Sequence, residues 1–161
     1  MGMRVLITSQ DIRSSQIGAD LLTQRERNWE VLSCHGAEAW RELDRGGLWD
    51  VVVWDLELGR WPHHRGAERP IIVAWCAPEA TGALSDAMAQ GADYPLVRHP
   101  GWESYFPEVL ECAAERAAET RGRRSEQDSV DALRLVQQSL LGSMSEPALV
   151  TNSLGAITHF N

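Results

Sequence analysis

Val51-Val52-Val53-Trp54-Asp55-Leu56-Glu57-Leu58-Gly59 is an apolar run that ends in a carboxylate and then a glycine. A continuous run of β-branched residues without polar alternation predicts a strand that is covered on both faces, as in a parallel sheet. Open α/β sheets form their sites at the carboxyl ends of such strands. Asp55 is therefore the first candidate for a functional side chain.

Strand-like and helix-like segments alternate on both sides of this run. Strands are expected at residues 4–8, 29–34, 51–54, 71–75 and 94–97, with helices over 17–22, 37–43, 78–91 and from 107 onward. Parallel neighbours need right-handed crossover connections, so this alternation predicts an α/β fold with a doubly wound, five-stranded parallel sheet. The stretch from Asp55 to Pro70 contains Pro62, two glycines and no amphipathic repeat, so the third helix is expected to be missing or reduced to a turn.

Composition bounds the class of protein. The 161 residues, 43% of them hydrophobic, suffice for one core and an appendage. A formal net charge of −8 argues against nucleic-acid partners, because phosphate backbones are held by clustered Lys and Arg. No apolar run approaches the ~18 to 20 residues of a membrane span, and the N-terminus lacks the pattern of a signal peptide. We therefore expect a cytoplasmic protein without membrane partners, whose Cys34, Cys76 and Cys112 are reduced core thiols.

Four segments in fixed order carry a family resemblance. They are Arg4 to Thr8, Asp55 to Gly59, Pro70 to Val73, and Gly91-Ala92-Asp93 leading into His99-Pro100. With this order and spacing, residues from about Met3 to Thr120 resemble a receiver domain of bacterial two-component signalling. The resemblance implies a flavodoxin-like fold, and it places Asp55 at the position that accepts a phosphoryl group in that family.

The family holds Mg²⁺ with an acidic pair after the first strand, and here that pair aligns with Ser9 and Gln10. Mg²⁺ takes oxygen ligands and is normally held by carboxylates, so Asp55 alone is a poor metal site. Asp11 is a possible substitute, but it lies one residue later and is better placed to cap the first helix. No metal or other cofactor is expected.

Two further positions of the family pattern are altered. Cys76 stands where the family has its switch Ser or Thr, and a thiol is a much weaker hydrogen-bond donor than a hydroxyl. His99 stands where the family has a Lys before proline, with Arg98 beside it and one extra residue in the strand. These two residues are the candidates for the cation of the site.

The substitutions favour a non-catalytic signalling module. In this interpretation Asp55 is a structural residue at the strand end, and the domain acts by dimerisation or partner binding without phosphorylation. The alternative is a working receiver, which takes a phosphoryl group from a partner histidine kinase onto Asp55 and binds Mg²⁺ with help from Asp11 or Glu57. A flavodoxin-like enzyme finds no support, because no phosphate-cradling glycine loop follows the first strand and no nucleophile stands beside a base.

Beyond the receiver-like domain of residues 1–120, the sequence turns to a charged segment and then to a heptad-like repeat. The repeat positions are Val130, Leu133, Gln137, Leu140 and Met144. We expect residues 121–145 to form a coiled-coil-like helical linker that makes the protein a homodimer, with an ordinary amphipathic helix packed back on the domain as the alternative. Trp61 is a second interface candidate, because Trp is enriched at interface hot spots.

Residues 146–161 resemble the start of a PAS sensory domain, with a strand, an Asn152-Ser153-Leu154-Gly155 turn and a second strand. Without that resemblance the same residues predict a β-hairpin. A hairpin alone cannot hold a core, so we expect a fragment of a larger sensor. The predicted function is a receiver module that relays its state through the helical linker to a PAS and output region.

Overall fold

The computed structural model describes residues 2–24, 28–45, 47–60, 69–143, 149–151 and 157–160. The chain divides into two units, Met1–Glu119 and Thr120–Asn161, and each is described by itself. None of the described helices is both long enough and apolar enough to cross a membrane.

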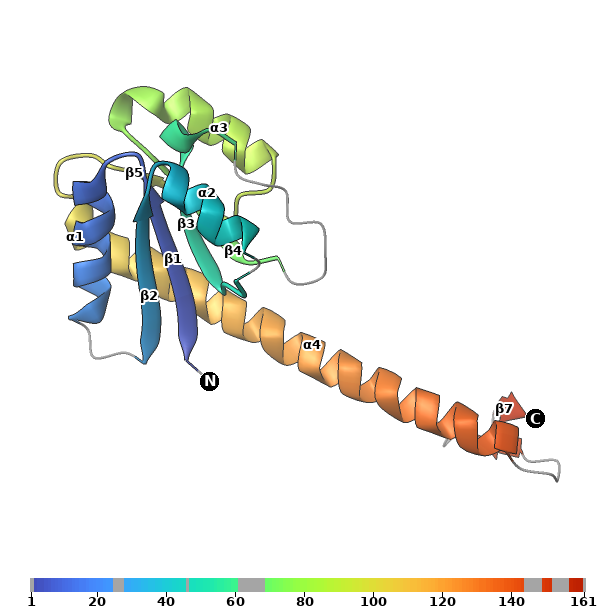
Figure 1. The fold of residues 1–161 in the computed structure, drawn as a ribbon. Coiled ribbons are helices and arrows are strands. Elements are labelled where there is room, and N and C mark those ends of the chain that lie inside the picture. Colours follow the sequence, from blue (N-terminus) through green and yellow to red (C-terminus); the bar gives the residue numbers. More distant parts are fainter. Residues whose placement is uncertain are drawn as a thin grey trace. The chain divides into compact units, whose positions relative to one another are not determined.

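The first unit is built on a parallel sheet of five strands in the order β2-β1-β3-β4-β5 (Figure 1). The strands are β1 (Met3–Ser9), β2 (Trp29–His35), β3 (Val51–Asp55), β4 (Ile71–Cys76) and β5 (Tyr94–Val97). This order is the flavodoxin-like one, so the predicted doubly wound, five-stranded parallel sheet is confirmed.

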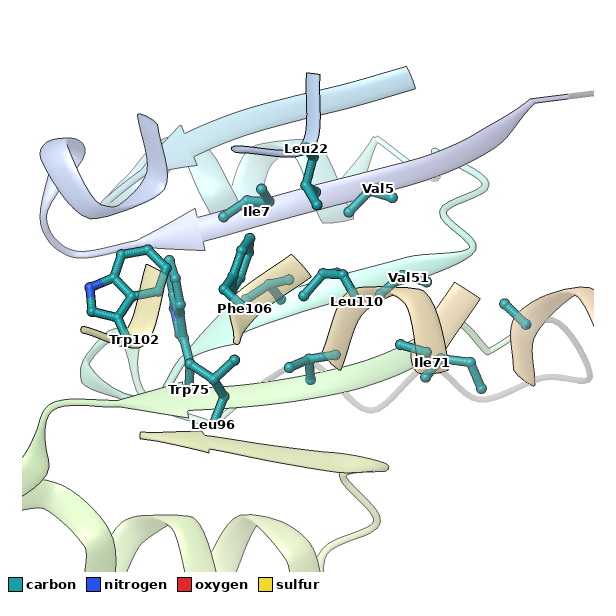
Figure 2. Packing of buried hydrophobic residues seen from close by; sticks show 14 residues of the cluster. Val5, Ile7, Leu22, Val51, Ile71, Trp75, Leu96, Trp102, Phe106 and Leu110 are labelled. Carbon is teal, nitrogen blue, oxygen red and sulfur yellow. The ribbon is translucent and has the colours of Figure 1, made fainter. Parts of the chain in front are cut away.

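Helices cover both faces of the sheet, as the continuous apolar strands require. They are α1 (Ile12–Thr23), α2 (Ala37–Asp44), α3 (Thr81–Ala89) and α4 (Phe106–Ser143). Alternate residues of β3 point to opposite faces: Val51 and Val53 pack toward α1 and the start of α4, whereas Val52 and Trp54 pack toward α2 and α3. Figure 2 shows the first of these two core layers.

Between β3 and β4, the described residues form one 3₁₀ turn, η1 (Leu56–Leu58). Gly59 ends this turn with φ +94°, a conformation that favours glycine, and its carbonyl accepts a hydrogen bond from Trp54 Nε1 at 2.8 Å. Residues 61–68, which include the interface candidate Trp61, lie outside the described residues. The side chains of Trp54 and Trp75 are both fully buried in the core.

One expectation about the cysteines was wrong. Cys34 and Cys76 are buried, but Cys112 is exposed. Cys112 precedes Ala113, which faces the sheet, and one residue corresponds to about 100° around a helix. The apolar residues beside Cys112 in the sequence therefore did not show which side of the helix its thiol occupies.

The second unit contains the rest of α4 and a pair of short strands. Helix α4 continues through the predicted linker as far as Ser143. Strands β6 (Leu149–Thr151) and β7 (Ile157–Phe160) pair antiparallel, with Leu149 opposite Phe160, as a β-hairpin requires.

Candidate functional site

The candidate site lies where the chain direction across the sheet reverses. From β1 the chain moves outward to β2, and from β3 it moves the opposite way to β4, so the carboxyl ends of β1 and β3 flank a topological switch point. Ser9 is the last residue of β1 and Asp55 is the last residue of β3. The sheet thereby brings together two of the positions that the sequence singled out.

Asp55 is fully buried and surrounded by donors. Its Oδ2 accepts hydrogen bonds from Ser9 Oγ at 2.8 Å, from the Gln10 backbone N–H at 3.1 Å and from Arg98 Nη1 at 2.8 Å. Its Oδ1 accepts from the Glu57 backbone N–H at 3.0 Å. An ionised carboxylate has room for about four hydrogen bonds. Four protein donors therefore share this carboxylate, three of them on Oδ2 and one on Oδ1.

Arg98 supplies the cation of the site. Its guanidinium lies 4.9 Å from the centre of the Trp75 ring, and Nη1 also lies 3.2 Å from Ser9 Oγ. The side chain is only 10% exposed, so the pair with Asp55 is largely shielded from water. His99, the other candidate, is exposed, as expected when successive residues at a strand end point to opposite sides.

Asp11 caps α1 instead of facing Asp55. Its Oδ1 accepts from the Arg13 N–H at 3.1 Å, and its Oδ2 accepts from the Ser14 N–H at 3.1 Å and the Ser14 hydroxyl at 2.9 Å. The Ser14 hydroxyl and then the Arg13 N–H lower the pKa of this carboxyl below its usual value, because both stabilise the charged form. Both oxygens of Asp11 are thus engaged in the first turn of the helix.

The donor set does not fit a Mg²⁺ site. Mg²⁺ prefers near-octahedral oxygen coordination that includes carboxylates. Asp55 is enclosed by donors, Asp11 is used as a cap, and Gln10 contributes its backbone N–H while the residue itself is exposed. Among the described residues, no group of three or more His, Cys, Asp or Glu side chains could hold a metal ion.

Cys76 lies at the end of β4, fully buried, and its carbonyl accepts a hydrogen bond from the Arg98 backbone N–H at 2.8 Å. Burial raises the pKa of its thiol. The Cys76 main chain therefore helps to position Arg98, and the thiol stays protonated at neutral pH.

Two residues that sequence reasoning did not assign to the site contribute to it. The Thr8 hydroxyl donates to the Val53 carbonyl at 2.9 Å and accepts from the Asp55 N–H at 3.2 Å. The Trp75 indole N–H donates to the Thr8 carbonyl at 2.9 Å. In the sequence, a buried threonine and a tryptophan of a core strand carry no signal that separates them from packing residues.

No family model and no curated protein sequence matches this chain. Three solved structures are similar to the chain in fold. NtrX from Brucella abortus, in complex with ADP, matches at 15% identity with a TM-score of 0.61, over 77% of this chain and 30% of that one. The receiver domain of the Francisella response regulator 1452 matches at 15% identity with a TM-score of 0.52, over 71% of this chain and 98% of that domain.

The third structure is a fusion that contains residues 181–211 of the yeast Spc42 trimeric coiled coil. It matches at 17% identity with a TM-score of 0.55, over 87% of this chain and 99% of the fusion. The chain spans less than a third of the NtrX protein but nearly all of the Francisella domain. These likenesses show the fold of a response-regulator receiver domain.

Proposed function

We propose that this chain is a signal-transduction module of two-component type that does not take its signal as a phosphoryl group on Asp55. The observation that carries the proposal is the enclosure of Asp55, which is fully buried and accepts hydrogen bonds from Ser9, Gln10, Glu57 and Arg98. The similarity of the fold to receiver domains supports the general role in signalling.

The chemistry of phosphoryl transfer argues in the same direction. Transfer to a carboxylate depends on positioning and on neutralising the charge of the phosphoryl oxygens, usually with a metal ion. In this chain one carboxylate oxygen of Asp55 already bonds to Arg98 and Ser9, and the other bonds to the Glu57 N–H. Of the two nearby acids, Asp11 caps α1, and Glu57 Oε1 lies 3.5 Å from Arg98 Nη2. Asp55 therefore acts as a fixed structural anion, and the module is not an enzyme.

The test is the intact mass of the protein after incubation with Mg²⁺ and a small-molecule acyl phosphate. We expect no added phosphoryl group, while a typical receiver with a complete acidic pair is labelled in the same tube. Asp55→Ala serves as the matched variant. A mass increase that disappears in Asp55→Ala would overturn the proposal in favour of the working receiver. Its further loss in Asp11→Ala or Glu57→Ala would identify the helping acid.

We further propose that the protein transmits its signal by self-association through α4. Four large apolar side chains in the described part of the second unit are exposed: Val130 at 46%, Leu133 at 70%, Leu135 at 70% and Val136 at 57%. Val130 and Leu133 belong to the predicted heptad seam, whereas the side chains of Leu140 and Met144 lie outside the described residues. The match to the coiled-coil fusion covers more of this chain than the match to the Francisella receiver domain, which supports a helical extension of the same kind.

We place the module in the cytoplasm as a homodimer in which parallel copies of α4 connect the receiver fold to the PAS-like residues 146–161. The antiparallel pair β6–β7 supports the hairpin with which that resemblance begins.

Sedimentation velocity over a range of protein concentrations tests this association. Leu133→Glu and Leu135→Glu form a matched pair, because both leucines are 70% exposed but only Leu133 lies on the seam. We expect a concentration-dependent dimer that Leu133→Glu weakens at least tenfold and Leu135→Glu leaves nearly unchanged. A wild-type monomer at high concentration, or equal weakening by both variants, would contradict the dimer.

A further inference from the structure

Three aromatic rings connect the Asp55 site with the start of α4. Trp75 lies 5.5 Å from Trp102 in an edge-on arrangement and 5.7 Å from Phe106, and Trp102 and Phe106 are 5.3 Å apart, again edge-on. Figure 2 shows these rings together on one face of the sheet, with Phe106 beside Leu110. Ring pairs at such separations attract one another in addition to the effect of burying their area. The cluster is therefore a defined packing unit.

Trp75 is fixed on the side of the site as well. The Arg98 guanidinium that bonds to Asp55 lies against its ring, at 4.9 Å from the centre. Its indole N–H is bonded to the Thr8 carbonyl at 2.9 Å, and the whole side chain is fully buried. Because interiors are closely packed, a change in the position of Arg98 is expected to shift the Trp75 ring and its neighbours.

Phe106 transmits the packing of Trp75 to the helix, because it is the first residue of α4. A Cβ atom built on Gly18 of α1 would lie only 3.2 Å from Phe106 Cζ, so the ring also has little room on its other side. The Tyr105 hydroxyl donates to the carbonyl of Val97, the residue before Arg98, and so ties the start of α4 to the same strand end.

We propose that Trp75 is a positioning residue that couples the Asp55–Arg98 ion pair to the first turn of α4. With the pair formed, Arg98 holds the Trp75 ring against Trp102 and Phe106, and the first turn of α4 is closed. Without the pair, the ring loses its cationic partner and the first turn of α4 opens more often. This inference goes beyond the proposed function, because it holds whether or not Asp55 can accept a phosphoryl group.

Hydrogen exchange of the full chain, read by mass spectrometry, tests the coupling. Arg98→Ala should speed amide exchange in residues 106–110 roughly two- to thirtyfold, the range that corresponds to the couplings measured through packed networks. Arg4→Ala is the matched control. Arg4 also pairs with a carboxylate, Glu30, and lies 4.7 Å from the centre of a tryptophan ring, Trp49, but its cluster does not reach α4. It should change exchange in residues 106–110 less than twofold.

A second background tests the role of Trp75 itself. In Trp75→Leu, adding Arg98→Ala should leave exchange at residues 106–110 unchanged, because the link has already been removed. Trp75→Phe, which keeps a ring but loses the indole N–H, gives the same comparison if the leucine variant does not fold. Equal acceleration by Arg98→Ala with and without Trp75, or equal effects of Arg98→Ala and Arg4→Ala, would overturn the proposal. Phosphorylation assays are not involved, so failure here leaves the proposed function separately testable.

Discussion

Replacing Arg98 by alanine is expected to lower the free energy of unfolding by about 3 kcal/mol. Removing one partner of a buried ion pair typically costs about 3 to 5 kcal/mol, because the other charge stays buried without compensation. Here Asp55 is 0% exposed but keeps three other donors, and Arg98 is 10% exposed, so the lower end of the range applies. The lost contact with the Trp75 ring, about 1 to 2 kcal/mol, is included in this value of about 3 kcal/mol.

Urea unfolding followed by circular dichroism measures this cost, with Arg4→Ala as the comparison. The Arg4–Glu30 pair has side chains 35% and 66% exposed, and such surface pairs contribute about 0 to 1 kcal/mol. We therefore expect Arg98→Ala to cost about 2 kcal/mol more than Arg4→Ala. Equal costs for the two variants would refute the reasoning, since both remove an arginine that contacts a carboxylate and a tryptophan ring.

A double variant separates the charge from the packing. Adding Asp55→Asn to Arg98→Ala removes the uncompensated carboxylate, so the double variant should be more stable than Arg98→Ala alone. If it is less stable, the loss in Arg98→Ala comes from packing against Trp75 and not from the buried charge.

Three further predictions concern other parts of the first unit. Asp11→Ala removes the cap of α1 and should cost about 1 kcal/mol at pH 7. Because folding lowers the pKa of this carboxyl, its stabilisation is lost as the pH falls through that lowered value, so the gap to wild type in urea unfolding should close below about pH 4. Leu110→Ala should cost about 2 to 5 kcal/mol in the same assay, since the side chain is fully buried, and a loss below about 1 kcal/mol would contradict its place in the core. A thiol reagent at pH 8 should modify only Cys112 in the folded protein, because burial raises the pKa of Cys34 to about 11 and also raises that of Cys76; a second adduct before denaturation, read by intact mass, would contradict this.

Much of the fold could be predicted because apolar periodicity determines it directly. The run from Val51 to Trp54 is buried along its whole length, as expected for a parallel strand that helices cover on both faces. The closeness of Ser9 and Asp55 was implied by the resemblance to receiver domains, in which Ser9 aligns with the acidic pair and Asp55 with the acceptor, and the Ser9–Asp55 hydrogen bond agrees with it.

The cation and its support could not be predicted in this way. Whether Arg98 or His99 faces Asp55 depends on where β5 ends, and the strand ends at Val97. A shift of one residue would have reversed which side chain points to the site. Trp75 contacts the guanidinium of Arg98, which follows the next strand. A contact between residues of different segments cannot be predicted from the sequence pattern of either one.

The chain distances within the site have a kinetic consequence. Three donors of Asp55 lie 43 to 46 residues away along the sequence, and the Arg98–Ser9 contact joins residues 89 apart. Contacts of such long range form after local structure, because the entropy of closing large loops must first be overcome. Arg98→Ala should therefore accelerate unfolding and leave the folding rate almost unchanged. The Asp55–Arg98 pair is thus expected to form late in folding, because it requires that the ends of β3 and β5 are already in place.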